Sequence, residues 1–125
     1  MTKRESVSIG KHCICDIYNI DATLLHDVKF LDRICVEGVE SGKATIVKKG
    51  VHKFSPYGLT GFYVLSESHL SYHTYPEHNM IMVDAFTCGD TASPLEIIKH
   101  IIAEIENSQQ TKVKVDMKYL DRGKI

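Results

Sequence analysis

The reactive side chains of this sequence are concentrated in residues 66–90. This stretch carries three histidines, two glutamates, two aspartates, several serines and one cysteine. Side chains of these types act as metal ligands, as nucleophiles, or as general acids and bases. Metal binding, hydrolytic catalysis and a purely structural role are therefore the three interpretations to weigh.

A metal site is the first interpretation, because His69, His73 and Glu77 follow one another at intervals of four. On a helix this spacing would suit zinc, but the surrounding Tyr72-His73-Thr74-Tyr75-Pro76 favours a strand. On a strand the three side chains share a face but lie too far apart to bind one ion. We therefore expect no metal.

A hydrolase is the second interpretation, with Ser68 or Cys88 as nucleophile and His73 as base. The sequence has no G-x-S-x-G motif and no obvious oxyanion-binding loop, so this signal is weak on its own. A structural role is the third interpretation and is the commonest one for a single histidine next to a strand. We assign it to His26, His52 and His100.

Composition indicates the kind of protein that must position these groups. The chain of 125 residues has the length of one domain, residues 1–125. Fifteen Lys and Arg against sixteen Asp and Glu exclude a nucleic-acid or membrane binder that acts through bulk charge. No apolar run is long enough to span a bilayer, and the N-terminal MTKRESVSIGKH lacks the apolar segment of a secretory signal. We expect a cytoplasmic protein with reduced cysteines.

The hydrophobic pattern predicts strands and two helices. The expected strands are residues 10–20, 44–54 with an interruption at 48–50, 61–67, 70–75, 80–88 and 111–117. One helix begins after an Asp21 N-cap and ends at Ser41-Gly42, and the other begins at Ser93-Pro94. The tail at 121–125 is expected to fray.

These elements predict an α+β fold, a two-layer α/β sandwich with a largely antiparallel sheet. Two helices can cover only one face of such a sheet. The other face must then be polar, or be buried against a second copy of the protein.

Two sequence blocks add a specific resemblance. Residues 67–77 (ESHLSYHTYPE), followed by DAFTCG at 84–89, resemble the signature of the S-adenosylmethionine decarboxylase proenzyme family in its short prokaryotic form. Upstream, GKH at 10–12 and HKFSPYGLTG at 52–61 are also similar to segments of that family. The resemblance extends over roughly residues 10 to 105.

The resemblance implies a chain that cuts itself between Glu67 and Ser68. The products would be a β chain of residues 1–67 and an α chain of residues 68–125. Ser68 would become a pyruvoyl group, the covalent cofactor that forms a Schiff base with the substrate amine.

The resemblance also implies roles for further residues. His73 corresponds to the base that assists processing, and Cys88 to the proton donor of the decarboxylation step. Thr60 stands where the family often has a serine that helps form the ester, and it keeps the hydroxyl while adding a methyl group. For the substrate, Phe54 corresponds to the ring that stacks on adenine, and Glu77 to the carboxylate that binds the ribose.

As the new chain terminus, Glu67 would add negative charge near the cationic sulfonium of the substrate.

The spacing of Ser68 and His73 sets a geometric condition, since a regular strand points residues five apart to opposite faces. If both serve one site, the backbone near residue 68 must leave the regular strand conformation, and such strain is found at reactive bonds.

The function implied is the conversion of S-adenosylmethionine to its decarboxylated form and carbon dioxide, for spermidine biosynthesis. The expected assembly is a homodimer of processed protomers that pair sheet to sheet in an αββα arrangement. Two alternatives stay open: a pyruvoyl-dependent arginine or ornithine decarboxylase of the same family, and a non-catalytic binding or regulatory relative.

Overall fold

Six antiparallel strands form one sheet in the computed structural model, which describes residues 8–125. The strands are β1 (Ser8–Tyr18), β2 (Ile46–Lys53), β3 (Leu59–Leu65), β4 (Ser68–Tyr75), β5 (Met80–Cys88) and β6 (Lys114–Lys124). Their order across the sheet is β2-β3-β4-β5-β1-β6. Short connections join β2 to β5 as a meander, and β1 lies between β5 and the C-terminal strand.

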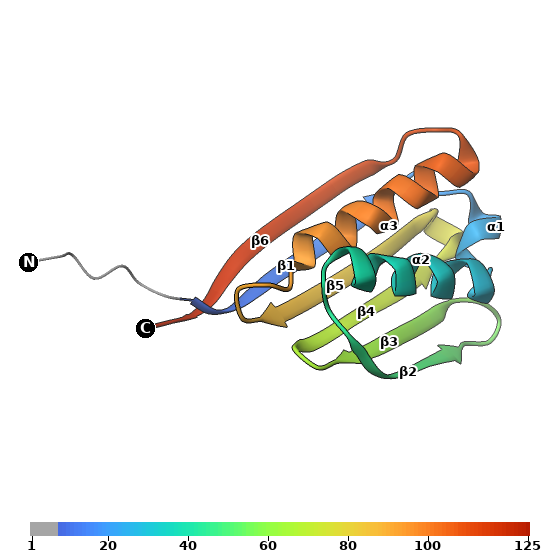
Figure 1. Ribbon diagram of the computed structural model, residues 1–125. Coiled ribbons are helices and arrows are strands. Elements are labelled where there is room, and N and C mark those ends of the chain that lie inside the picture. Colours follow the sequence, from blue (N-terminus) through green and yellow to red (C-terminus); the bar gives the residue numbers. More distant parts are fainter. Residues whose placement is uncertain (1–7) are drawn as a thin grey trace, which may run out of the picture.

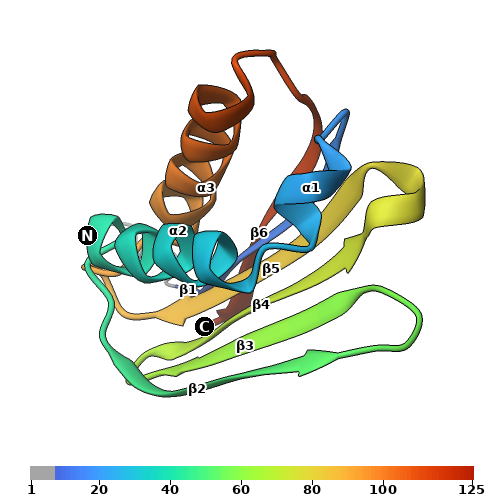
Figure 2. The same cartoon turned by 90° about the vertical axis from the view of Figure 1, so that its right-hand side faces the viewer.

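Two long helices cover one face of this sheet (Figures 1 and 2). The helical elements are α1 (Ala22–Leu25), α2 (Val28–Ser41), the 3-10 turn η1 (Pro76–His78) and α3 (Pro94–Gln109). The predicted α+β two-layer architecture is therefore confirmed. The start of α3 is also confirmed, because Ser93 caps the helix by accepting a hydrogen bond from the Glu96 amide at 3.2 Å.

The first helix is broken where the sequence predicted one continuous helix. Asp21 caps only the short α1, and Asp27 then caps α2 by accepting a hydrogen bond from the Phe30 amide at 3.0 Å. Asp27 has extended backbone angles, so the chain leaves the helix and enters it again. The apolar stripe continues through both pieces and therefore did not reveal the break.

Two strand predictions are also wrong. The β2 strand has no interruption at 48–50, and its irregularity is a register shift between Ile46 and Lys48. Residues 121–124 do not fray, because β6 pairs with β1 along its whole length, from Tyr18 opposite Lys114 to Ser8 opposite Lys124. The tail is therefore held in the sheet by its pairing with the long strand β1, which the local sequence of the tail does not reveal.

The core lies between the helices and the sheet. Alternate strand residues point into it, and among them are Cys13 and Cys15 of β1, which pack with Cys35 of α2. Burial raises the pKa of the Cys15 and Cys35 thiols to about 12, so both stay protonated. All four cysteines are unpaired, as expected.

The opposite face of the sheet carries no helix, and we call it the open face. Four apolar side chains on it are between 41% and 44% exposed: Ile14, Phe62, Val64 and Leu120. None of the helices between residues 8 and 125 has the length and apolar character needed to cross a membrane. The expectation about a secretory signal falls partly on residues 1–7, outside the described residues.

Candidate active site

Ser68 lies directly after the tight turn that joins β3 to β4. Leu65 pairs with Ser68, so Ser66 and Glu67 alone form the turn. Ser68 has a φ of +155°, a value that L-residues rarely adopt. The backbone thus departs from the regular strand conformation at the residue where the sequence analysis required it.

Cys88 meets this turn from the end of β5. Its Sγ lies 3.8 Å from Ser68 Oγ, and its backbone amide donates a 2.9 Å hydrogen bond to the Glu67 carbonyl oxygen. Cys88 alternates with buried Thr87, so its side chain belongs to the open face. The irregular backbone at Ser68 therefore allows its hydroxyl to reach a group on that face.

The Glu67 side chain is held at the same turn. Its Oε2 accepts a hydrogen bond from the Thr45 amide at 3.4 Å, and the Ser66 amide donates to the Thr45 carbonyl at 2.9 Å. Hydrogen bonds from Ser66 and from the Thr45 amide lower the pKa of the Glu67 carboxyl below its ordinary value. A negative charge is therefore present beside Ser68.

A second group of predicted site residues lies at the other end of β4. Thr60 and His73 are cross-strand partners, and Thr60 Oγ1 lies 2.9 Å from His73 Nδ1 in a hydrogen bond. Both line a pocket of about 270 Å³ together with Phe54 and Glu77. Phe54 is 52% exposed, and its ring packs edge-to-face with that of His52 at 4.6 Å between centroids.

The structure thus places the predicted residues in two groups. Ser68, Glu67 and Cys88 form the first, and the residues around His73 form the second. Five residues along a strand rise about 16 Å, so Ser68 and His73 do not meet within one protomer.

Sequence reasoning missed a cluster of polar side chains on the open face. His12 Nε2 lies 2.5 Å from Asp84 Oδ1, and His69 Nε2 lies 3.4 Å from the same oxygen. Arg122 Nη1 lies 3.3 Å from His12 Nδ1. These residues come from β1, β5, β4 and β6, and no local sequence pattern links strands so distant along the chain.

The cluster explains where His69 lies without requiring a metal ion. His69 groups with His12 and Asp84 rather than with His73 and Glu77. Arginine can only donate, so Nδ1 of His12 accepts from it and Nε2 carries the proton that Asp84 accepts.

Comparison with known proteins agrees with these features. The family model described as "S-adenosylmethionine decarboxylase" matches residues 11–123. The "S-adenosylmethionine decarboxylase proenzyme" of Caldanaerobacter subterraneus is 37% identical over 109 residues, covering 86% of this chain and 88% of the relative. The protein of the same name from Clostridium tetani is 36% identical over 109 residues, covering 86% of each chain.

A solved structure is similar over nearly the whole chain. The crystal structure of the adenosylmethionine decarboxylase from Aquifex aeolicus superposes with a TM-score of 0.81 at 30% identity, covering 93% of this chain and 92% of that one. The chain therefore belongs to the S-adenosylmethionine decarboxylase family.

Proposed function

We propose that this chain is a self-processing decarboxylase that converts S-adenosylmethionine to its decarboxylated form and carbon dioxide. The product would be an aminopropyl donor for spermidine synthesis. The observation that carries the proposal is the Glu67–Ser68 turn, where a hydroxyl nucleophile follows a carbonyl that already accepts a hydrogen bond from the Cys88 amide. Family membership supports the same reaction.

Processing would begin at that carbonyl. Ser68 Oγ attacks the Glu67 carbonyl carbon, the carbon–nitrogen bond breaks, and the Ser68 nitrogen takes up the proton, which leaves an ester between the two residues. The Cys88 amide is placed to stabilise the negative charge that develops on the carbonyl oxygen during the attack. Such a donor lowers the barrier without needing to move.

Elimination and hydrolysis would then complete the cleavage. Loss of the Ser68 α-proton expels the Glu67 carboxylate and leaves dehydroalanine at position 68. Water replaces the nitrogen, which departs as ammonia, and the α chain of residues 68–125 begins with a pyruvoyl group. The β chain of residues 1–67 ends at Glu67.

The structure's two groups of site residues support a homodimer. We propose that two protomers pair through their open faces about an axis that crosses the middle of β4. Such a two-fold axis would place the His73 end of one protomer over the Ser68 end of its partner. Each site would then combine Ser68 and Cys88 of one copy with Thr60 and His73 of the other.

The His73 imidazole, oriented by Thr60, is our candidate base for the proton transfers of processing. The Thr60 hydroxyl holds Nδ1 at 2.9 Å, so the ring presents Nε2 for proton transfer.

The substrate would bind through the same composite site. Phe54 would stack on the adenine ring and the Glu77 carboxylate would accept hydrogen bonds from the ribose hydroxyls. The pyruvoyl group supplies an electron-withdrawing carbonyl for decarboxylation. The Cys88 thiol, in contact with residue 68, would donate the proton that replaces the lost carboxylate.

Intact-mass spectrometry of the denatured protein tests the proposal. Self-cleavage predicts a β chain of about 7.6 kDa, which is 67/125 of the 14.1 kDa chain, and an α chain of about 6.5 kDa without a free N-terminal amine. Ser68→Ala should remain at 14.1 kDa, whereas the control Ser71→Ala should cleave. Persistent full-length wild-type protein would refute self-processing.

Release of carbon dioxide from carboxyl-labelled substrates identifies the substrate. The proposal expects release from S-adenosylmethionine and none from arginine or ornithine. Release from arginine or ornithine alone would retain the cofactor chemistry and overturn the substrate assignment. Cleaved protein that releases carbon dioxide from none of the three would contradict the decarboxylase function.

A further inference from the structure

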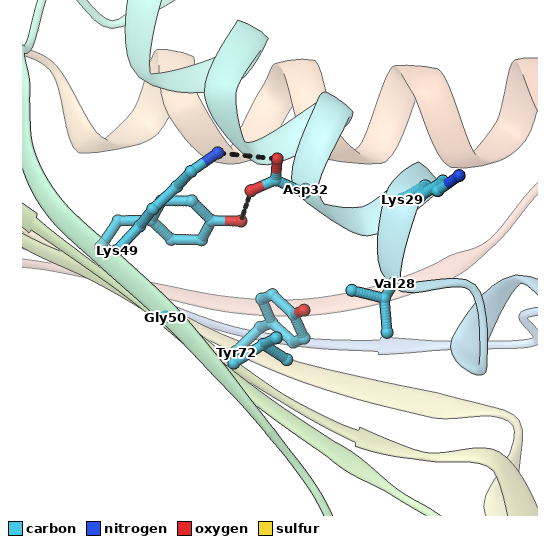
Figure 3. Close-up of a pocket in the computed structure, with 8 residues that line it drawn as sticks. Val28, Lys29, Asp32, Lys49, Gly50 and Tyr72 are labelled. Atoms are coloured by element: carbon cyan, nitrogen blue, oxygen red, sulfur yellow. Dashed lines mark hydrogen bonds and ion pairs between the residues drawn. The ribbon is translucent and has the colours of Figure 1, made fainter.

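A second pocket lies on the other face of the sheet, between α2 and the strands β2, β3 and β4 (Figure 3). We call it the helix-side pocket. Its volume is about 280 Å³, and it is lined by Val28, Lys29, Asp32, Lys49, Gly50, Val51, Tyr63 and Tyr72. None of the residues proposed above for processing or substrate binding lines it.

The position of Tyr72 in this pocket depends on the glycine at position 61, which has no side chain. Gly61 and Tyr72 are cross-strand partners, and the Tyr72 ring lies over the Gly61 backbone. A Cβ at Gly61 would lie only 2.2 Å from Cε2 of that ring. The absence of a side chain at Gly61 therefore lets the buried Tyr72 ring pack at this position, at the bottom of the pocket.

The polar groups of the pocket include only one carboxylate, and it is already satisfied. Asp32 accepts a hydrogen bond from Lys49 Nζ at 2.8 Å and another from Tyr63 Oη at 2.8 Å (Figure 3). An ammonium has three donors, so Lys49 retains two for another acceptor.

The Tyr72 hydroxyl has no such partner. Tyr72 is 2% exposed, and its hydroxyl makes no hydrogen bond to the protein within residues 8–125 but is not cut off from solvent. Figure 3 shows it pointing from the sheet towards α2, beside Val28. The hydroxyl is therefore free to donate a hydrogen bond to an acceptor bound in the pocket.

We propose that the helix-side pocket binds a small carboxylate with an aromatic or apolar body. The body would lie against Val28 and Val51, and the carboxylate would accept hydrogen bonds from the Tyr72 hydroxyl and the free Lys49 donors. The volume suits a ligand the size of a single substituted ring.

Charge decides the class of ligand. Lys49 and Asp32 neutralise each other at 2.8 Å, and Lys29 on the rim has no ion-pair partner among residues 8–125. The pocket therefore has one positive charge in excess and only donors to spare. A cationic ligand would be repelled by the ammonium groups of Lys29 and Lys49. A neutral ligand would gain no attraction from the excess positive charge.

Binding of three matched probes tests this inference on the purified full-length protein. Benzoate, benzyl alcohol and benzylamine share a ring and differ in charge. In NMR titrations of isotope-labelled protein we expect saturable shifts at Val28, Val51 and Tyr72 with benzoate, with a Kd on the order of 1 mM. Benzyl alcohol and benzylamine should bind at least about tenfold more weakly, which corresponds to one lost charged contact.

Two variants separate this pocket from nonspecific binding. Tyr72→Phe removes only the unpaired hydroxyl, so it should fold as well as the wild type and bind benzoate about five- to tenfold more weakly. Val51→Phe should fill the pocket and abolish the shifts, whereas the control Val47→Phe, on the same strand but outside the pocket, should not.

Three results would overturn the proposal. The first is the absence of saturable benzoate shifts at the pocket, and the second is equal or tighter binding of benzyl alcohol or benzylamine. The third is unchanged benzoate affinity in both Tyr72→Phe and Val51→Phe. The readout is binding rather than decarboxylation, so a failed decarboxylase assay would leave it unaffected.

Discussion

At the scale of single residues, the hydrogen bond between Thr60 and His73 should set the rate of self-cleavage. Thr60→Ala removes the group that orients the imidazole at 2.9 Å, and losing one such bond corresponds to about a tenfold slower reaction. Thr60→Ser keeps the hydroxyl and removes a methyl group, so it should cleave at least as fast as the wild type. A time course of full-length protein on denaturing gels measures both rates.

The control for this prediction is Ser71→Ala, which changes a hydroxyl on the same open face without touching the pair. Its cleavage should match that of the wild type. Equal rates for Thr60→Ala and wild type would mean that the hydrogen bond has no part in processing, and His73 would then need another partner to orient it.

A substitution at Cys88 should affect self-cleavage and decarboxylation differently. The backbone amide is proposed to act in self-cleavage, and the thiol in decarboxylation. Cys88→Ala keeps the amide that donates to the Glu67 carbonyl, so the chain should still be cleaved. It removes the thiol beside residue 68, and loss of a general acid should slow decarboxylation by about 100-fold or more. Mass spectrometry reports the first reaction and release of labelled carbon dioxide the second.

A Cys88→Ala protein that fails to cleave would place the thiol, rather than the amide, in the processing step. A protein that cleaves and decarboxylates normally would remove Cys88 from the reaction altogether.

At the scale of elements, Asp32 links α2 to the two strands beneath its N-terminal half. Partial burial favours a higher pKa for its carboxyl, but hydrogen bonds from Lys49 and Tyr63 outweigh burial, so the pKa lies below its ordinary value. A lowered folded-state pKa contributes stability above the unfolded value near 3.9, and this stability is lost as the pH falls through the folded-state value.

Asp32→Asn should therefore lower the free energy of unfolding by about 1 kcal/mol at neutral pH, because the group is partly exposed and its pair is screened. The difference from wild type should shrink as the pH falls below about 4. Urea unfolding at several pH values measures it. The control Glu40→Gln changes a carboxylate of the same helix that has no ion pair within residues 8–125. A difference independent of pH would contradict the prediction.

The elements also show which features could be predicted from sequence. The Ser93 cap and the strand at 70–75 depend on neighbours along the chain, and these predictions are confirmed. The extent of β6 depends on β1, about a hundred residues earlier, and the Arg122–His12–Asp84–His69 cluster on four different strands. Such contacts arise only when the sheet is assembled, so no local pattern reveals them.

The proposed site shows the same distinction between what the local sequence reveals and what depends on the assembled sheet. The resemblance selected residues such as Ser68 and His73 because they stand at fixed places in a sequence block. It did not reveal that they lie at opposite ends of one strand, because that separation follows from β4 being extended from Ser68 to Tyr75.

At the scale of the whole molecule, the proposed homodimer depends on the open face. It combines exposed Phe62, Val64 and Ile14 with the polar cluster around Asp84, while both long helices cover the other face. A homodimer through this face would bury those apolar side chains. Phe62→Glu should therefore give a monomer in analytical ultracentrifugation, whereas the control Val47→Glu should remain a dimer.

Co-expression of two inactive variants tests whether the site is shared between protomers. Ser68→Ala lacks the nucleophile, and His73→Ala lacks the proposed base, so each homodimer should remain largely uncleaved. In a mixed dimer the Ser68→Ala chain brings its intact His73 to the Ser68 of the His73→Ala chain. Only the His73→Ala chain should then be cleaved, and differently sized tags on the two chains identify it by mass.

A site contained in one protomer predicts no rescue, since neither chain then holds both groups. Adding Phe62→Glu to both chains gives the matched control, because it should prevent pairing and abolish the rescue while leaving Ser68 and His73 in place. Rescue that survives this control would require another interface. Rescue that depends on Phe62 would mean that the separation of about 16 Å along β4 is bridged by the second copy, since each copy supplies what the other lacks.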